Sequence, residues 1–289
     1  KIMILGGARE NGKNMYAVQV EDEIFIMDAG LKYPDSSLLG IDVVIPDLQF
    51  FQDYADKIAG IFLTHGHADS IGALPYILRD HDIPVFGSKL TIELAKIAIQ
   101  RENRRRKNDL FHVIDADTEI EFKNANVSFF KTTHSIPDSL GIDISTKEGE
   151  IVYTGDFKFD PSAKKGYRTD FVRLSEIAQK GVLALLSDST NAEANFPNDR
   201  QTSIEKYIYN IFENYDGRII AAAKASNIVR VQEIFQAAAA TGRHVFLTGR
   251  DAGKIVYTAM KLGYLNVPKG LLVHSKDLKK IPDNELVIL

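Results

Sequence analysis

Three apolar stretches of the chain, each predicted to be a β-strand, lead directly into residues that commonly bind metal ions. IAGIFLT precedes His65, His67 and Asp69, NVSFFKTT precedes His134, and IVYTG precedes Asp156. Because side chains that follow neighbouring strands gather at one edge of a sheet, we expect these residues to lie close together. Imidazoles combined with carboxylates suit zinc or manganese. The pattern therefore predicts a metal site built at the end of a sheet.

Each of these motifs is a weak signal when it is taken alone. The two histidines of HGHAD lie two residues apart in an extended loop, so both rings can project to the same side. Gly66, between them, is expected to allow a sharp turn. An HxH pair is common, however, and a single histidine at the end of a strand is more often a hydrogen-bonded structural residue. The joint occurrence of the motifs, each after an apolar strand, favours the metal site.

The composition excludes several other kinds of site. The chain has no cysteine, so it has no disulfide, thiolate zinc site or cysteine nucleophile, and any metal ion must be held by His, Asp or Glu. The net charge of −4 gives no overall attraction to nucleic acid, so RNA or DNA contact requires a local basic surface. The densest basic run, RENRRRKND at 101–109, is interpreted either as a solvated helix end or as a phosphate-contacting patch, and the helix end is favoured.

The sequence gives no sign of a membrane or export segment. No apolar run approaches the length of about 18 residues that a membrane helix needs. The N-terminal apolar run is only four residues long, which is too short for the core of a signal peptide. We therefore expect a cytoplasmic protein without a membrane segment.

The pattern along the chain predicts two domains. Residues 1–195 contain short strands at both ends with helices between them. From residue 196 to 289 helices and strands alternate strictly, which indicates a parallel sheet covered by helices. The turn-forming segment NFPND, at 195–199, is the predicted boundary. Because the chain stops inside a predicted strand at Leu289, we expect these residues to be part of a longer protein.

The motifs together resemble a known family. HGHAD, TTHS and TGDFKFD, in this order and at this spacing, are similar to the metallo-β-lactamase fold. The longer runs GGARENGKNMY, DAGLKYPDSSLLGIDVVIPD, HSIPDSLG, LLSDSTNAE and ASNIVRVQ resemble ribonuclease J of the β-CASP branch, over essentially the whole chain. The resemblance implies an α/β fold: an αββα metallo-β-lactamase sandwich at 1–195 with an inserted parallel α/β β-CASP domain, truncated here to its N-terminal part at 196–289.

The same resemblance implies roles for individual residues. His65, His67, His134 and Asp156 match the ligands of the family's first metal ion. Asp69 matches a ligand of the second ion, with Asp156 bridging the two. Asp69 and Asp156 are therefore the expected catalytic residues, and the expected cofactor is a pair of zinc or manganese ions.

Two positions depart from the family's pattern. The family's HxHxDH motif ends here in Ser70, and its SNIHR motif carries Val229 in place of the histidine. A serine hydroxyl is neutral and short, so we expect an intact first metal site, an impaired second site and a reduced rate. A second interpretation makes Ser70 the N-cap of a predicted helix at 71–80, which explains why serine is accommodated there. Ser88 is the predicted N-cap of the following helix.

Five further residues are candidates with open alternatives. Asp28 is expected to fix a loop hydrogen bond beside the site. Asp188 and Ser189 are assigned either to support of the site and its RNA or to turn formation. Asn227 and Arg230, in the run ASNIVRVQ, are candidates for RNA support.

The resemblance implies two main functions. The first is a ribonuclease that degrades 5′-monophosphorylated RNA from its 5′ end, with internal cleavage as well, in rRNA processing and mRNA decay, and with activity weakened by Ser70. The second is a largely non-catalytic subunit that stabilises or regulates an active ribonuclease J paralogue in a hetero-oligomer, since the altered motif resembles that of the degenerate paralogue. A homodimer is the other expected assembly. A small-ester or lactam hydrolase is disfavoured, because such an enzyme does not need the helix–strand alternation after residue 195.

Overall fold

The computed structural model describes residues 1–102, 108–160, 163, 167–193 and 200–289. The chain divides into two compact units, Lys1–Thr190 and Asn191–Leu289. The boundary predicted from the sequence, within NFPND, lies outside the described residues.

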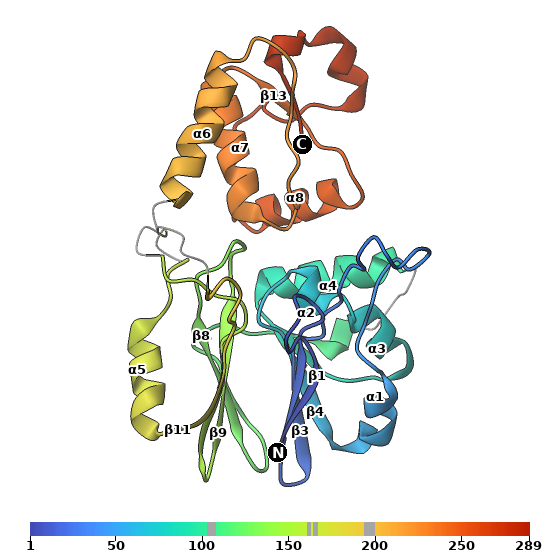
Figure 1. Ribbon diagram of the computed structural model, residues 1–289, viewed down its shortest axis with the longest axis vertical. Helices are drawn as coiled ribbons and strands as arrows, with labels where there is room; N and C mark the ends of the chain where they lie inside the picture. The colour runs from blue at the N-terminus through green and yellow to red at the C-terminus, as the bar shows by residue number, and fades with distance from the viewer. Residues whose placement is uncertain (103–107, 161–162, 164–166, 194–199) are drawn as a thin grey trace. The chain divides into compact units, whose positions relative to one another are not determined.

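A six-stranded sheet forms one layer of the first unit (Figure 1). Its strands follow their sequence order across the sheet: β1 (Ile2–Gly6), β2 (Met15–Val20), β3 (Glu23–Met27), β4 (Ile58–Phe62), β5 (Val85–Gly87) and β6 (Phe111–Val113). β1, β2 and β3 pair antiparallel, with a short turn only between β2 and β3, whereas β3 to β6 pair in parallel. The carboxyl ends of β3 and β4 therefore meet at the same edge of the sheet.

A five-stranded sheet forms the second layer. Its strands are β7 (Glu119–Glu121), β8 (Asn126–Lys131), β9 (Leu140–Thr146), β10 (Gly149–Tyr153) and β11 (Val182–Leu186), in the order β11-β10-β9-β8-β7. All neighbours are antiparallel except β10 and β11, which are parallel. The apolar stretches NVSFFKTT and IVYTG predicted β8 and β10, whereas β7 and β11 were not predicted.

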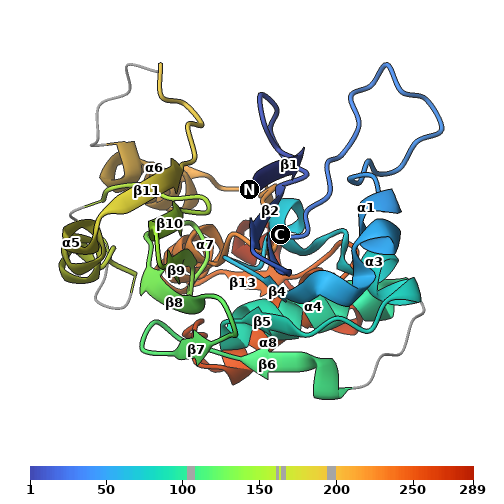
Figure 2. The same cartoon turned by 90° about the horizontal axis from the view of Figure 1, so that it is seen from below.

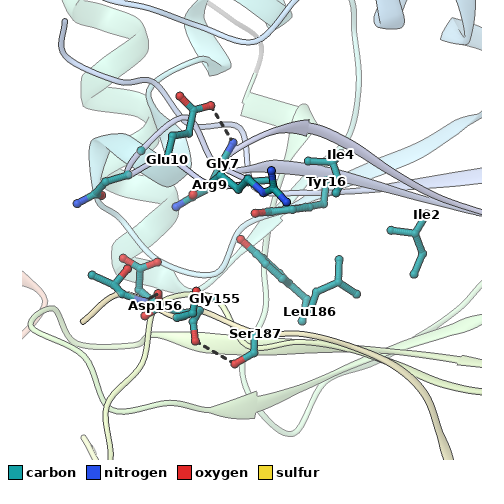
Figure 3. A pocket seen from close by; sticks show the side chains of 18 residues that line it. Ile2, Ile4, Gly7, Arg9, Glu10, Tyr16, Gly155, Asp156, Leu186 and Ser187 are labelled. Atoms are coloured by element: carbon teal, nitrogen blue, oxygen red, sulfur yellow. Dashed lines mark hydrogen bonds between the residues drawn. The ribbon is translucent and has the colours of Figure 1, made fainter. Parts of the chain in front are cut away.

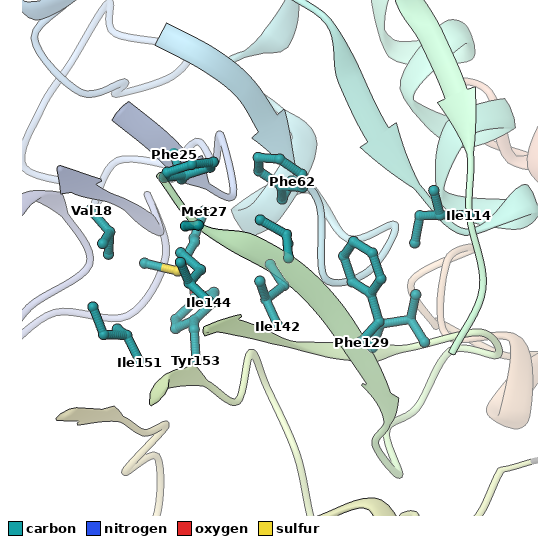
Figure 4. Packing of buried hydrophobic residues seen from close by; sticks show 13 residues of the cluster. Val18, Phe25, Met27, Phe62, Ile114, Phe129, Ile142, Ile144, Ile151 and Tyr153 are labelled. Carbon is teal, nitrogen blue, oxygen red and sulfur yellow. The ribbon is translucent and has the colours of Figure 1, made fainter. Parts of the chain in front are cut away.

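The hydrophobic core lies between the two sheets (Figure 4). Alternate residues of each strand point inward, as the two-residue period of a strand requires. Phe25 and Phe62 from the first sheet and Phe129 and Ile142 from the second are fully buried. The ring centroids of Phe62 and Phe129 are 6.4 Å apart, so aromatic contacts join the layers.

Helices cover the outer faces of both sheets, which completes the αββα sandwich. α1 (Gln49–Asp53), α3 (Leu74–Asp80) and α4 (Lys89–Arg101) lie outside the first sheet, and α5 (Phe171–Lys180) lies outside the second (Figures 1 and 2). Ile177 of α5 packs against Phe130 and Val152 of the second sheet. The predicted αββα fold of this unit is confirmed.

The helix predicted at 71–80 is two helices in the structure. α2 (Ala68–Ile71) follows His67, and α3 begins after a break at Gly72 and Ala73. Ser70 therefore lies inside α2, and its predicted role as an N-cap is wrong. The reason is that the His67 carbonyl accepts the amides of Ser70 and Ile71, so the helical turn already begins at His67. Ser88 does occupy the N-cap position of α4, although its hydroxyl pairs with that of Thr91 at 2.8 Å.

The second unit is a three-stranded parallel sheet with helices. Its strands are β12 (Ile219–Ile220), β13 (His244–Phe246) and β14 (Leu286–Ile288), in the order β12-β14-β13, and its helices are α6 (Arg200–Asn214), α7 (Ile228–Ala240) and α8 (Ala252–Lys261). The predicted parallel α/β arrangement is confirmed. Within the described part of the chain, no helix is long and apolar enough to cross a membrane.

Candidate metal centre

Three imidazoles converge at one edge of the sandwich although they come from different sheets. His65 and His67 follow β4 of the first sheet, and His134 follows β8 of the second. One nitrogen of each ring lies within 4.8 Å of the other two, and Nε2 of His134 is 3.1 Å from Nδ1 of His67. Tetrahedral zinc with bonds of about 2.1 Å places its donor atoms about 3.4 Å apart. The three nitrogens are therefore close to the spacing that a divalent ion requires.

Two carboxylates extend this cluster. Oδ1 of Asp69 lies 3.7 Å from Nε2 of His65. Oδ2 of Asp156 lies 3.9 Å from Nε2 of His65 and 3.9 Å from Nε2 of His134. His65, Asp69 and Asp156 thus form a second group of potential ligands beside the three histidines. Asp156 is placed next to both groups.

The electrostatics of the cluster fit a metal ion. Burial, followed by the neighbouring His67 and His134, lowers the pKa of His65 well below its ordinary value. Burial, followed by His67, lowers the pKa of His134 to about 3. Both rings are therefore neutral at pH 7, which is the form that binds metal ions. Nε2 of His65 and Oδ1 of Asp69 are buried and form no hydrogen bond to the described residues, so a metal ion would satisfy two otherwise unpaired atoms.

The orientation of His65 is fixed by a buried chain of hydrogen bonds. The Thr64 hydroxyl donates to the carboxylate of Asp28 at 2.9 Å, and the Tyr153 hydroxyl donates to the same carboxylate at 2.9 Å. Because the single hydroxyl proton of Thr64 is used in this way, Thr64 accepts from Nδ1–H of His65 at 2.9 Å. This selects the tautomer with a free lone pair on Nε2. Asp28 was expected beside the site, but Thr64 and Tyr153 were not predicted to support it. The one signal in the sequence for such a role is that Thr64 directly precedes His65.

Two glycines allow the close packing of the ligand loop. A Cβ atom on Gly30 would lie 1.6 Å from the carbonyl oxygen of Asp69, so only glycine lets the loop after β3 pass this backbone. A Cβ atom on Gly66 would lie 2.6 Å from Cδ1 of Leu94. Gly66 is not among the residues with positive φ, so it serves close packing against α4 rather than the sharp turn that was expected.

Ser70 contributes no atom to either group of potential ligands in the described part of the chain. Its side chain is fully buried, and Oγ lies 3.4 Å from Nδ1 of His65. It is held by its backbone: the amide donates to the carbonyl of His67 at 3.0 Å, and the carbonyl accepts from Ala29 at 2.8 Å. The hydroxyl thus occupies the side of His65 that Thr64 already serves.

Asp188 and Ser189 lie beside the metal centre, at the end of β11. The amide of Asp188 donates to the Thr154 hydroxyl at 3.1 Å, and its Oδ1 accepts from the Thr190 amide at 2.7 Å. The second contact is the turn-forming bond that one of the sequence interpretations expected. Both residues also line a pocket together with Asp156. The apolar run VLALL was the signal that would have placed this turn at the end of a strand.

The remaining candidates lie elsewhere. Asn227 and Arg230 belong to the second unit, where Oδ1 of Asn227 caps α7 by accepting the Arg230 amide at 3.0 Å and Arg230 pairs with Glu233 at 2.6 Å. Val229 follows the first residue of α7. The basic run at 101–109 begins at the last residue of α4, and its segment 103–107 lies outside the described residues.

Comparisons with known proteins agree with the fold. Residues 8–207 match the Metallo-beta-lactamase superfamily, and residues 216–289 match the family described as Ribonuclease J, beta-CASP domain. The chain is 54% identical over 290 residues to Ribonuclease J 2 of Streptococcus pyogenes serotype M3, covering 100% of this chain and 52% of that protein. It is 46% identical over 289 residues to Ribonuclease J 2 of Staphylococcus epidermidis, with the same coverage of 100% and 52%. The chain thus spans about half the length of the curated relatives it matches.

A solved structure shares the fold as well. The crystal structure of a protein of unknown function from Enterococcus faecalis V583 superimposes with a TM-score of 0.67 and 14% identity, over 100% of this chain and 76% of that one. The sequence relatives, the matched families and the αββα sandwich therefore agree: the chain belongs to the ribonuclease J family of the metallo-β-lactamase superfamily.

Proposed function

We propose that this chain supplies the metal centre of a metal-dependent ribonuclease that acts on 5′-monophosphorylated RNA, from the 5′ end and internally. The observation that carries the proposal is the convergence of His65, His67, His134 and Asp156 in a chain of the ribonuclease J family. Zinc or manganese suits this donor set. When bound, such an ion would supply an activated water and neutralise charge on the phosphate.

The residues of the chain have separable tasks in this proposal. His65, His67, His134 and Asp156 hold the first ion, and the low pKa of His65 and His134 keeps protons from competing for it. Thr64 and Asp28 orient the His65 ring. Asp69 holds part of the second position, which Ser70 leaves one ligand short. The expected result is a nuclease with reduced activity.

A direct test is degradation of a 5′-monophosphorylated RNA by the purified full-length protein with added manganese, beside its Asp156→Ala variant. Loss of degradation in the variant, with shortened RNA in the parent reaction, supports the ribonuclease. Equal background in both reactions would contradict it.

Ser70 also favours a second candidate function. A chain with an incomplete second metal position would be retained as a subunit that stabilises or regulates an active ribonuclease J paralogue. Mixing the full-length protein with such a paralogue, followed by sedimentation and by nuclease assays of each chain alone and of the mixture, tests this function. For a non-catalytic subunit, we expect the two chains to form a hetero-oligomer. We also expect the mixture with the Asp156→Ala variant to have the same nuclease activity as the mixture with the parent chain. Failure of the two chains to associate would exclude it.

A further inference from the structure

A pocket of about 620 Å³ opens beside the metal centre (Figure 3). One wall is the loop that joins β1 to β2, and the facing wall is the turn that follows β11. Asp156 lies at one end of the pocket, and the apolar side chains of Ile2, Ile4 and Leu186 lie at the other. The volume is typical of a small-molecule or nucleotide site.

Arg9 supplies the positive charge of this pocket. It is the only cationic residue among those that line the pocket, and it forms no ion pair with any residue that the structure describes. Its neighbour Glu10 is already neutralised, because its carboxylate lies 3.1 Å from Nζ of Lys13 and 3.5 Å from Nζ of Lys32. The charge of Arg9 is therefore available to a ligand.

The backbone holds Arg9 in an unusual conformation. Its φ of 60° lies in the left-handed region, which costs a residue other than glycine about 1 kcal/mol. The loop is closed by Glu10, whose Oε1 accepts the Gly7 amide at 3.3 Å (Figure 3). Strained backbone conformations of this kind occur at functional sites, so the strain at Arg9 indicates that the loop holds its side chain at the edge of the pocket for a function.

Tyr16 adds an aromatic face and a donor. Its ring centroid lies 5.3 Å from that of Tyr153, which is itself anchored to Asp28. The Tyr16 hydroxyl forms no hydrogen bond to the described residues, unlike the hydroxyl of Tyr153. The pocket thus offers one cation, one hydroxyl donor, an aromatic face and an apolar end, beside the carboxylates of Asp156 and Asp188.

We propose that this pocket is a nucleotide subsite, in which Arg9 binds a phosphate of the RNA chain next to the phosphate at the metal centre. A guanidinium group matches two phosphate oxygens at once, and the Tyr16 hydroxyl is positioned as a further donor. The apolar end, at Ile2, Ile4 and Leu186, receives the base. This inference rests on the proposed function, because it takes RNA as the ligand.

The test measures binding of a phosphorothioate-linked, 5′-monophosphorylated RNA oligonucleotide to the full-length protein at several salt concentrations. Arg9→Asn removes the charge but keeps a residue that adopts the left-handed conformation readily. Arg9→Lys keeps the charge. Lys147→Ala is the matched control, because Lys147 is an exposed cation in the β9–β10 turn, at the other end of β10 from Asp156.

The expected result for Arg9→Asn is an affinity about tenfold lower, with the slope of log K against log salt reduced by about 0.7. Arg9→Lys should keep most of the affinity for RNA. Lys147→Ala should bind RNA as tightly as the parent protein, and all variants should have the metal content of the parent. An Arg9→Asn variant that matches Lys147→Ala in both affinity and salt dependence would overturn the subsite while the ribonuclease proposal stands. An unmodified protein that binds no RNA would overturn both.

Discussion

The hydroxyl of Ser70 lies 3.4 Å from Nδ1 of His65, the ring nitrogen that already donates to Thr64, rather than from the Nε2 that faces the other ligands. Serine at this position therefore does not substitute for a ligand. Its hydroxyl packs against His65 on the side of the ring away from the other potential ligands. In the proposed metal centre, the second position therefore relies on Asp69 and Asp156.

Replacement of Ser70 by histidine should raise the metal content. A third potential ligand beside Asp69 and Asp156 would strengthen the second metal position, and a gain of about 10² to 10³ in nuclease rate would follow if the proposed reaction is correct. The measurement is the number of metal ions per chain by elemental analysis, beside the nuclease rate. Ser70→Ala is the control and should leave the metal content as it is. An unchanged metal content in Ser70→His would show that the deficiency lies elsewhere in the protein.

Replacement of Asp156 by alanine should empty the first metal position. Asp156 lies 3.9 Å from the donor nitrogens of both His65 and His134, so its loss removes the ligand placed next to both groups. Elemental analysis of the purified variant measures the result. Glu148→Gln, an exposed carboxylate in the β9–β10 turn, is the control. A variant that retains the metal content of the parent would remove the basis of the metal centre described above.

Replacement of Thr64 by valine should weaken metal binding without unfolding the protein. The change removes the hydroxyl between Asp28 and His65, and the loss of such a supporting contact typically costs 10- to 100-fold in metal affinity. The Asp28 carboxylate also loses a donor, at a cost of about 1 to 3 kcal/mol in stability. Competitive metal titration and thermal unfolding measure the two effects.

Thr132→Val is the matched control for this experiment. The Thr132 hydroxyl is buried and forms no hydrogen bond with the described residues, although the residue lies two positions before His134. The control should bind metal as tightly as the parent. Equal losses in both valine variants would show that the Thr64 hydroxyl has no special role.

Replacement of Asp143 by asparagine should stabilise the second sheet at alkaline pH. Burial, followed by the neighbouring Glu150, raises the pKa of Asp143 from 3.8 to about 7. Because this folded-state pKa lies above the unfolded one, the group's contribution to stability falls as the pH rises from about 4 to about 7, and the loss is complete above that. Asparagine does not titrate, and its amide can donate to Glu150 while its oxygen still accepts from Ser128.

Hydrogen exchange of the β9 and β10 amides at pH 5 and pH 8 measures this effect in the full-length protein, after correction for the intrinsic pH dependence of exchange. The gain in protection from Asp143→Asn should be clear at pH 8 and much smaller at pH 5. The exposed Glu148→Gln variant should show no such difference. A loss of protection at both pH values would mean that the asparagine is not accommodated.

Much of the fold followed from local signals. The parallel sheet of the second unit was predictable because each apolar strand alternates with an amphipathic helix, and β14 is recognisable from the run ELVIL. α5 was not predicted, although Asp170 caps its start and Gly181, with a φ of 96°, follows its end. Both signals are present in the sequence. The helix was missed because only one of its residues, Ile177, is buried, so its apolar face is narrow.

The convergence of the candidate ligands was predictable from the sequence, but the contacts that support them were not. His65, His67, His134 and Asp156 each follow an apolar strand, which makes their convergence foreseeable from the sequence. The contact of Tyr153 with Asp28 joins residues 125 positions apart across two sheets, and no local pattern contains that information. Long-range contacts of this kind require the packing of the two layers to be known.

The tight passage of Gly30 against the carbonyl oxygen of Asp69 has a consequence for how this chain tolerates change. The ligand loop is tied down through main-chain atoms, since the carbonyl groups of Ala68, Asp69 and Ser70 accept amides from Leu31, Asn14 and Ala29. No side chain at position 70 is needed to keep that loop in place. The hydrogen bonds that hold the loop use only main-chain atoms, so an exchange of the side chain at position 70 removes none of them.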